Sequence, residues 1–467
     1  MHMRSHRRGL ALALGVMLAA ASTATRARAQ APLQVGSPDG KNVVSVGVRE
    51  GVLYYTVDRA GRHVILPSRL GFAFRGARDL RDSLRIVSST RSSYDTTWTQ
   101  PLGEVARVRD HHNELRVQVA ETVAPKRQFT LAVRAFDDGV GFRYEVSDSG
   151  GFGDYEMSDE LTEFTFADDA RAWWIPANQP KPDRYEDLYS SSPVSKLDTV
   201  HTPLTLEMQN GTKVVLHEAN LVDYAGMNLA GTGTRTLRAA LAPWADGVKV
   251  RGRAPFVTPW RTLQLADRVE DLAPSVLGLK LNPPSRIENT SWIKPLKYDG
   301  IWWGMHVGTM TWSQGPKHGA TTENTRRYID FAAKNGLGGV LVEGWNTGWD
   351  GDWMNNGAHF SFTQPYPDYD LPALAAYAKS KGVTLIGHNE TAMGIENYER
   401  QLDSAFALYQ RLGIKAIKTG YVTDKTAEGH SHTGQYMVRH YRKVVETAAK
   451  YGIEVDVHEP IKDTGER

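Results

Sequence analysis

Polar side chains that can carry acid, base or metal chemistry gather at the ends of three short apolar runs in the C-terminal part of the sequence. His388 and Glu390 end the first run, Lys418 lies in the second, and His458 and Glu459 end the third. The alternation of apolar and polar residues in the third run, and the short length of all three, predict β-strands. If the strands are parallel, their carboxyl ends meet on one rim, where barrel folds place their chemistry. We therefore predict one site that contains these five side chains.

Each of these side chains also has a purely structural interpretation. Glu390 and Glu459 can act as acid, base or metal ligand, but they could equally form ion pairs, for example with Lys418 on the strand between them. Lys418 could be a point charge that lowers the pKa of a neighbouring carboxylate. His388 and His458 could donate hydrogen bonds to substrate hydroxyls, support a metal ligand, or serve as hydrogen-bonding scaffold. The residue types alone leave these alternatives open.

The elements that must position the site alternate between strand and helix over residues 299–467. We expect five βα units, whose strands are the segments Gly300–Trp303, Gly339–Glu343, Thr384–Glu390, Ala416–Val422 and Ile453–Glu459. Right-handed crossovers can wind them into a (β/α)₈ barrel or an open doubly wound sheet. No glycine-rich phosphate loop follows the first strand, which disfavours dinucleotide binding. Five units are about three short of a closed barrel, so we expect the sequence to be the front part of a longer protein.

The preceding part of the chain has a different pattern. Residues 30–283 contain strands and turns almost exclusively, and Asn210-Gly211 between two strand-like runs favours a hairpin turn. This predicts a large antiparallel β-sandwich. The proline-rich segment 284–298 is the expected linker to the partial barrel.

The first 29 residues have the features of a cleaved signal peptide: arginines, an apolar run from Gly9 to Ala21, and Ala27-Arg28-Ala29 as cleavage site. The apolar run is too short to span a bilayer, and no later stretch is long enough. We expect a periplasmic or secreted protein that is cleaved after Ala29. The chain has no cysteine, so core burial must supply the stability that disulfides give many exported proteins. The formal net charge is +2, but the leader holds five arginines and no acidic residue, so the chain without its leader carries a net charge of −3. This negative charge argues against a nucleic-acid partner.

Several short motifs resemble glycoside hydrolase family 97, from about Gln30 to the end of the chain. These motifs are Arg134–Val140, Trp174–Ala177, Tyr185-Glu186, His388–Thr391, Lys418–Tyr421 and His458–Pro460. The resemblance implies an N-terminal β-supersandwich, a (β/α)₈ TIM barrel and a small C-terminal β-sandwich, of which the sequence would contain the first and part of the second.

The family contains inverting α-glucosidases and retaining α-galactosidases, and the resemblance points to the inverting branch. Retaining members carry an aspartate nucleophile two residues after the lysine of the fourth strand, and Gly420 occupies that position here. Inversion needs roughly 6.5–9.5 Å between acid and base so that a water fits, and a glycine leaves room for it. Without the resemblance, Gly420 would be read as a bend or a close backbone approach.

The resemblance also implies roles for the remaining residues. Glu390 and Glu459 match the carboxylates that activate water, and Glu186 and Glu459 match calcium ligands, whose oxygens suit Ca²⁺. The three basic residues of the predicted site, His388, Lys418 and His458, match residues that hold the sugar.

The expected protein is therefore a calcium-dependent α-glucosidase that cleaves oligosaccharides with inversion. The alternatives are an α-galactosidase of the same family and a truncated, non-catalytic carbohydrate-binding protein. The family's general acid and a further calcium-binding glutamate belong to units beyond the end of this sequence, so we expect this fragment to be impaired. The sequence does not indicate an oligomeric state, and a monomer is the simplest expectation.

Overall fold

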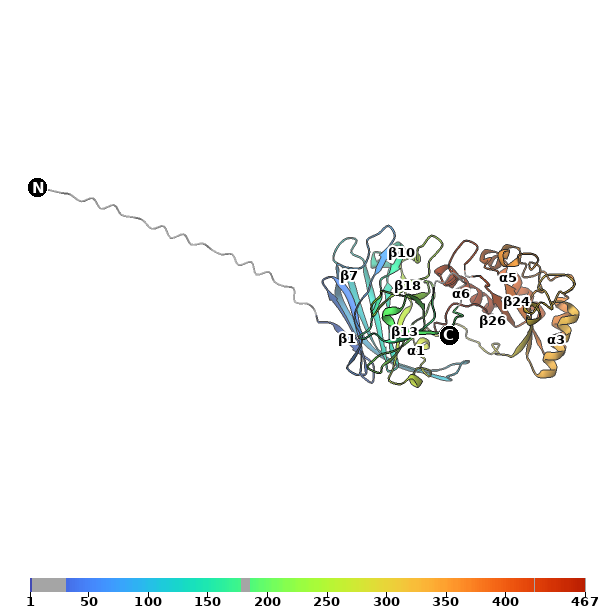
Figure 1. Cartoon of the computed structure of the whole chain (residues 1–467), viewed down its shortest axis with the longest axis horizontal. Helices are drawn as coiled ribbons and strands as arrows, with labels where there is room; N and C mark the ends of the chain where they lie inside the picture. Colours follow the sequence, from blue (N-terminus) through green and yellow to red (C-terminus); the bar gives the residue numbers. More distant parts are fainter. Residues whose placement is uncertain (2–30, 178–184, 424, 467) are drawn as a thin grey trace.

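The structure is a computed structural model that describes residues 1, 31–177, 185–423 and 425–466 (Figure 1). The predicted signal peptide, apart from Met1, lies outside the described residues. In Figure 1 the chain forms a β-rich part, coloured blue to yellow-green, beside a part of mixed helices and strands in orange and red. Within the described residues, no helix is long and apolar enough to cross a membrane.

The β-rich part contains β1 to β21 in four antiparallel sheets. The first sheet has the order β1 (Leu33–Gly36), β2 (Asn42–Arg49), β3 (Val52–Arg59), β4 (Arg62–Arg69), and the second β19 (Val250–Arg253), β10 (Asp154–Glu160), β5 (Phe72–Phe74). The third has the order β11 (Glu163–Thr165), β18 (Thr236–Leu241), β17 (Met227–Gly231), β14 (Thr199–His201). The largest runs β13 (Ser190–Pro193), β12 (Arg171–Trp174), β15 (Leu204–Glu207), β16 (Lys213–Ala219), β21 (Trp260–Ala266), β9 (Gly139–Val146), β8 (Gln128–Phe136), β7 (Arg107–Glu121), β6 (Leu84–Thr99), and β20 (Phe256–Val257) pairs with β9.

Alternation of side chains explains why these segments are strands that face a common core. Every second residue of β3 is buried, as expected when successive side chains point to opposite faces. The predicted hairpin around Asn210-Gly211 is present, because β15 pairs antiparallel with β16 and Gly211 has a positive φ of 89°. An antiparallel β-sandwich architecture therefore accounts for the N-terminal part of the chain.

The sandwich core also contains a fully buried ionic cluster. Arg261 pairs with Glu160 at 2.5 Å and with Glu218 at 2.7 Å, and all three side chains are inaccessible to solvent. The hydroxyl of Tyr224 donates to Glu160, and Glu218 accepts the backbone N–H of Met227. Buried charges require such partners because desolvation is costly.

The second part is built on five parallel strands in sequential order. They are β22 (Tyr298–Ile301), β23 (Gly339–Val342), β24 (Thr384–Glu390), β25 (Ala416–Gly420) and β26 (Glu454–Val457). The helices are α2 (Trp303–His306), α3 (Thr322–Asn335), α4 (Leu371–Ser380), α5 (Ile395–Leu412) and α6 (Gln435–Lys450), and α1 (Leu277–Lys280) precedes this part. The strand order does not reverse within the described residues, unlike the order in a doubly wound sheet.

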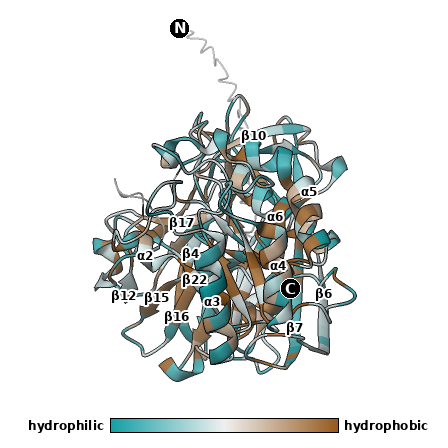
Figure 2. Ribbon diagram, turned by 90° about the vertical axis from the view of Figure 1, so that its right-hand side faces the viewer, coloured by the Kyte–Doolittle hydropathy of each residue, from teal (hydrophilic) through white to brown (hydrophobic). Residues whose placement is uncertain are grey.

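Helix ends follow the signals in the sequence. Thr321 caps α3, because its hydroxyl accepts the N–H of Asn324, and Gly336 ends the helix in the left-handed region at φ 71°. The longer helices have buried apolar faces and exposed polar faces, and Figure 2 shows brown and teal residues along α3 and α5. The prediction that the first strand reaches Trp303 was wrong: β22 ends at Ile301 and the exposed Trp303 begins α2. Aromatic residues favour strands, but the chain turns before them.

The parallel sheet is strongly curved. The hydroxyl of Tyr298 on β22 donates to Asp456 on β26 at 2.5 Å, although these are the first and last strands of the sheet. Figure 1 shows the end of the described chain returning to the junction of the two parts. There the carbonyl of Thr464 accepts hydrogen bonds from Asn220 and Asn282 next to the sandwich.

Candidate active site

Two neighbouring strands bring four of the positions of interest onto one face of the parallel sheet. The register of β24 and β25 pairs His388 with Lys418, and Glu390 with Gly420. Residues two apart in a strand point to the same face, so these positions form a two-by-two array at the carboxyl end of the sheet. Glu343, directly after β23, extends the array toward the first strand, as its contacts show.

Glu343 is the partner of the strand-four lysine. Lys418 Nζ lies 3.1 Å from Glu343 Oε1, and His388 Nε2 lies 3.7 Å from the same oxygen. The indole N–H of Trp312 donates to Glu343 Oε2 at 3.0 Å. Burial opposes ionisation of Glu343, but the neighbouring positive charge and these hydrogen bonds outweigh it and lower its pKa. The predicted effect of Lys418 on a carboxylate thus falls on Glu343, a residue to which the sequence prediction gave no role.

His388 is a buried, neutral imidazole. Burial lowers its pKa to about 4, the charge of Glu343 acts against this, and the charge of Lys418 adds to it. Its ring stacks on Trp349 at a centroid distance of 5.7 Å, and its Nδ1 is buried without a hydrogen-bond partner in the described structure. A buried polar atom without a partner is uncommon, so this nitrogen is well suited to a ligand hydroxyl.

Glu390 fills the space that a side chain on β25 would take. A Cβ atom added to Gly420 would lie 1.9 Å from Glu390 Oε2, so only glycine fits beside this carboxylate. Glu390 Oε1 accepts the backbone N–H of Ala392 at 2.7 Å. Burial raises the pKa of Glu390 to about 7, the hydrogen bond from Ala392 acts against this, and the charge of Glu459 adds to it. Glu390 is therefore a carboxyl group that can exchange a proton near neutral pH.

Glu459 lies beside Glu390 across the end of β25. The backbone N–H of Tyr421 donates to Glu459 Oε2 at 3.1 Å, and the next N–H, from Val422, lies 3.4 Å from Glu390 Oε1. His458 Nδ1 lies 2.8 Å from Glu459 Oε2, and this contact raises the pKa of His458. Glu459 follows the last strand at a positive φ of 52°, a backbone strain that often occurs at functional sites. The two carboxylates therefore flank one strand end, as the sequence predicted.

The Glu186 loop of the sandwich reaches toward the same region. Its neighbour Tyr185 has a positive φ of 63° and lies under the ammonium group of Lys462, 5.0 Å from the ring centroid. Burial raises the pKa of Tyr441, and Tyr185 and Glu459 are both among the nearby groups that add to this. Tyr185 and Glu459 thus share Tyr441 as a neighbour.

The donor chemistry of Glu186 and Glu459 suits calcium, since both supply carboxylate oxygens. Glu186 is exposed and Glu459 is at the strand end. Calcium takes six to eight oxygen ligands, and the described residues contain no group of three or more acidic or histidine side chains arranged for a metal. The pair would supply only part of a coordination shell.

Sequence reasoning missed two residues on the rim face, Glu343 and Asp456. Glu343 ends the second strand in the way that Glu390 ends the third, so the same positional signal could have found it. Asp456 pairs with Lys418 in the register of β25 and β26 and therefore lies on the same face of the sheet, where Tyr298 contacts it. Its role depends on the curvature of the sheet, for which the sequence carries no local signal.

The family profiles cover both parts of the chain. The glycosyl-hydrolase 97 N-terminal profile matches residues 35–284, and the glycoside hydrolase 97 profile matches residues 302–467. A solved glycoside hydrolase family 97 enzyme from a Pseudoalteromonas species, in complex with acarbose, is 45% identical with a TM-score of 0.89. The match covers 93% of this chain and 67% of that one, and a variant of such an enzyme in complex with panose matches equally well.

Relatives known by sequence carry a different activity in their names. A retaining alpha-galactosidase of Bacteroides thetaiotaomicron is 26% identical in an alignment of 474 positions that covers 94% of this chain. A probable retaining alpha-galactosidase of Streptomyces bingchenggensis is 28% identical in an alignment of 433 positions that covers 87% of this chain. The chain spans 66% and 58% of the lengths of these two relatives. On the family profiles and the structural match, the chain belongs to glycoside hydrolase family 97.

Proposed function

We propose that the protein hydrolyses α-glucosidic bonds of oligosaccharides with inversion of configuration. The observation that carries the proposal is the space beside Gly420, which Glu390 occupies so closely that no strand-four nucleophile can stand there. A retaining mechanism needs a carboxylate that forms a covalent intermediate, whereas an inverting one needs a carboxylate that activates water. The complexes of the Pseudoalteromonas enzyme with acarbose and panose support a glucoside as substrate.

Glu459 is the proposed general base. Two donors, the N–H of Tyr421 and the ring nitrogen of His458, hold its Oε2 and stabilise the ionised form that a base requires. Glu390, with its raised pKa, shares the water and can hold its proton transiently. The proton of the attacking water thus passes to this pair of carboxylates while the glycosidic bond breaks.

The interior of the curved sheet holds the sugar in this proposal. The ammonium group of Lys418 and the Nδ1 atom of His388 would bind hydroxyl groups of the sugar, and the Glu343 carboxylate would accept hydrogen bonds from those hydroxyl groups. The five strands are proposed to be the first five of a (β/α)₈ barrel. The chain spans about two thirds of the structural relative, so the proposed reaction is that of the whole protein. None of the residues assigned above is proposed as the general acid that protonates the leaving group.

Calcium binding is proposed for Glu186 and Glu459 as two contributors to a larger donor set. A bound calcium would supply positive charge that fixes and polarises the substrate. Treatment with a chelator is expected to lower both the unfolding temperature and the rate, with recovery on calcium but not on magnesium. Unchanged unfolding and rate after metal removal would contradict calcium dependence.

We propose that the protein is exported, because residues 1–29 have the features of a cleaved signal peptide. N-terminal sequencing of the protein from its native host is expected to begin at Gln30. A mature chain that still begins at Met1 would contradict it.

The second candidate is an α-galactosidase, which the names of the two curated relatives favour. A panel of nitrophenyl α-glycosides separates the two, because the sugar hydroxyl that differs between them changes kcat/KM by orders of magnitude when the site hydrogen-bonds it. Preference for the galactoside would replace the glucosidase proposal. Binding of oligosaccharide without any cleavage would support a non-catalytic carbohydrate-binding protein.

The role of the base is tested by Glu459→Gln. Loss of a general base typically costs about 10²–10⁴-fold in rate, so kcat should fall by that order. Glu446→Gln on the exposed face of α6 is the matched control and should leave kcat unchanged. Equal rates for the two variants would refute the role of Glu459.

A further inference from the structure

A chain of hydrogen bonds runs from the end of β25 to the outer helices α5 and α6. Tyr421 follows β25 directly, its side chain is fully buried, and its ring packs edge-on against His440 and Tyr441 of α6. The Tyr421 hydroxyl lies 3.0 Å from Nε2 of His440, and Nδ1 of His440 lies 2.9 Å from a carboxylate oxygen of Glu399 on α5. Lys443, in the next turn of α6, pairs with the other oxygen of that carboxylate. Neither His440 nor Glu399 takes part in the reaction proposed above.

The direction of these hydrogen bonds follows from the acids and bases in the chain. The hydrogen bond from His440 lowers the pKa of Glu399 to about 2, burial acts against this, and Lys443 adds to it. An ionised carboxylate only accepts hydrogen bonds, so Nδ1 of His440 carries the proton. Burial lowers the pKa of His440, although Glu399 acts against this, so the ring is neutral and its Nε2 accepts the hydrogen bond of the Tyr421 hydroxyl. The chain therefore has a single orientation, from Tyr421 through His440 to Glu399.

The backbone at Tyr421 holds both carboxylates of the candidate site. Its N–H donates to Glu459 Oε2 at 3.1 Å, and the next N–H along the chain lies 3.4 Å from Glu390 Oε1. On the other side of the same peptide, the carbonyl of Gly420 accepts the N–H and the hydroxyl of Thr391 at 3.0 and 2.7 Å. A glycine restricts the backbone least, so the peptide that follows Gly420 depends on such contacts for its orientation. The anchored ring of Tyr421 fixes the end of this peptide that lies toward the helices.

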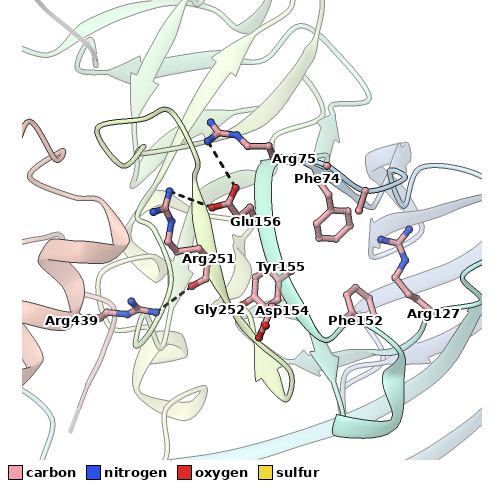
Figure 3. Close-up of a pocket in the computed structure, with 12 residues that line it drawn as sticks. Phe74, Arg75, Arg127, Phe152, Asp154, Tyr155, Glu156, Arg251, Gly252 and Arg439 are labelled. Carbon is pink, nitrogen blue, oxygen red and sulfur yellow. Dashed lines mark hydrogen bonds and ion pairs between the residues drawn. The ribbon is translucent and has the colours of Figure 1, made fainter.

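The helix that carries His440 is itself fixed on the sandwich. Figure 3 shows Arg439 reaching from α6 to the carbonyl of Arg251 on β19, at 3.2 Å, and the same guanidinium group pairs with Asp223 at 2.6 Å. One turn earlier, the buried side-chain amide of Gln435 accepts the N–H of Arg251 and donates to its carbonyl. The sandwich therefore holds α6 on one side, and α6 presents His440 to the candidate site on the other.

We propose that His440 and Tyr421 are positioning residues that hold Glu459 and Glu390 in place from the helix side of the sheet. The ring of Tyr421, fixed at its hydroxyl, fixes the backbone N–H groups to which the carboxylates are bonded. Catalytic groups depend on such placement, because a misplacement of about 1 Å can cost about 10²-fold in rate. The benefit to catalysis rests on the proposed function, whereas the chain of hydrogen bonds rests on the structure alone.

The backbone amide of Tyr421 tests the anchoring without any substrate. The protein is labelled with ¹⁵N-tyrosine, and the Tyr421 amide signal is assigned with Tyr421→Phe. His440→Asn keeps a donor near the position of Nδ1 but has no acceptor at the position of Nε2, so the Tyr421 amide signal should move toward that of an N–H without a hydrogen bond. His440→Gln places a side-chain oxygen near the position of Nε2 and should keep the signal near its wild-type position. The amide signal of Tyr55 in the sandwich is the internal control and should stay in place in both variants.

Steady-state kinetics with a nitrophenyl glucoside test the consequence for the rate. Tyr421→Phe removes only the hydroxyl and should lower kcat by about tenfold, because the carboxylates are displaced by less than the 1 Å that costs about 10²-fold. KM should not change, because the residues proposed to hold the sugar lie outside this chain of hydrogen bonds. Tyr55→Phe is the matched control: its buried hydroxyl donates to the carbonyl of Glu163 in the sandwich at 2.9 Å, so it loses the same atom and should leave kcat unchanged. His440→Gln should retain more of kcat than His440→Asn.

The outcomes separate this inference from the proposed function. A Tyr421 amide signal that His440→Asn leaves in place, or that His440→Asn and His440→Gln move equally, overturns the inference whatever the enzyme cleaves. A wild-type kcat for Tyr421→Phe, or a raised KM with kcat unchanged, also overturns it. If the enzyme proves to cleave another glycoside, the proposed function fails, while the amide test stands and the kinetic test uses the nitrophenyl derivative of that sugar.

Discussion

Replacement of Gly420 by alanine tests the packing on which the candidate site depends. The new Cβ would lie 1.9 Å from Glu390 Oε2 and 2.7 Å from its Cδ, whereas ordinary contacts begin at 3.4 Å. Glu390 would have to retreat by about 1.5 Å, away from its hydrogen bond with the N–H of Ala392. The φ of Gly420 is not positive, so alanine fits the backbone there and the effect is purely steric.

The expected magnitudes follow from this displacement. Overpacking of a filled site typically costs about 1–3 kcal/mol, so Gly420→Ala should lower the free energy of unfolding by that amount. A misplacement of about 1 Å in a catalytic group can cost about 10²-fold in rate, so kcat should fall at least as far. Denaturant unfolding gives the first quantity and initial rates with a nitrophenyl glucoside give the second.

A double variant and a control make the reasoning refutable. Gly420→Ala combined with Glu390→Ala removes both clashing groups, so the two stability effects should be strongly non-additive. Gly36→Ala is the control, because its nearest contacts would be an ordinary 3.8 and 3.9 Å. If Gly420→Ala matched Gly36→Ala in stability and the wild type in kcat, Glu390 would not occupy the assigned position.

Three further perturbations test the electrostatics of the fold. The pKa of Glu390 rises from 4.5 to about 7 on folding. This shift corresponds to about 3 kcal/mol of stability that is present below pH 4.5 and is lost as the pH rises through 7. Glu390→Gln should remove this part of the pH dependence of stability, which denaturant unfolding between pH 4 and 8 measures. Arg261→Met should lower the free energy of unfolding by about 3–5 kcal/mol, because it leaves two buried carboxylates without their cationic partner. Arg268→Met on the surface is the control and should cost little. Equal costs for the two variants would mean that the buried cluster is not ionic. Lys418→Met raises the pKa of Glu343, so its destabilisation should be larger at pH 8 than at pH 5 in thermal unfolding, and a pH-independent effect would argue against the Lys418–Glu343 pair.

Local signals in the sequence predicted the elements of the second part well. The capping threonine and the C-terminal glycine of α3 fixed that helix, because caps act through contacts within a few residues. The strand ends at Glu390 and near Glu459 followed from short alternating patterns. These patterns also sufficed to place both carboxylates at the same end of the sheet.

Contacts between distant residues could not be read in this way. The prediction offered Glu390 and Glu459 as ion-pair partners of Lys418, but its partner in the structure is Glu343, two strands away. The fit of Glu390 against Gly420 depends on the register of β24 and β25, and a one-residue slip would turn every side chain to the other face. The meeting of Tyr298 with Asp456 depends on the curvature of the whole sheet.

The stereochemistry of the reaction tests the central claim most directly. Proton NMR of the sugar first released from an α-glucoside, recorded before mutarotation, distinguishes the two anomers. A water activated by Glu459 and Glu390 attacks from the face opposite the leaving group, so the β-anomer should appear first. The α-anomer as first product would require a covalent nucleophile and would contradict the role assigned to these two carboxylates.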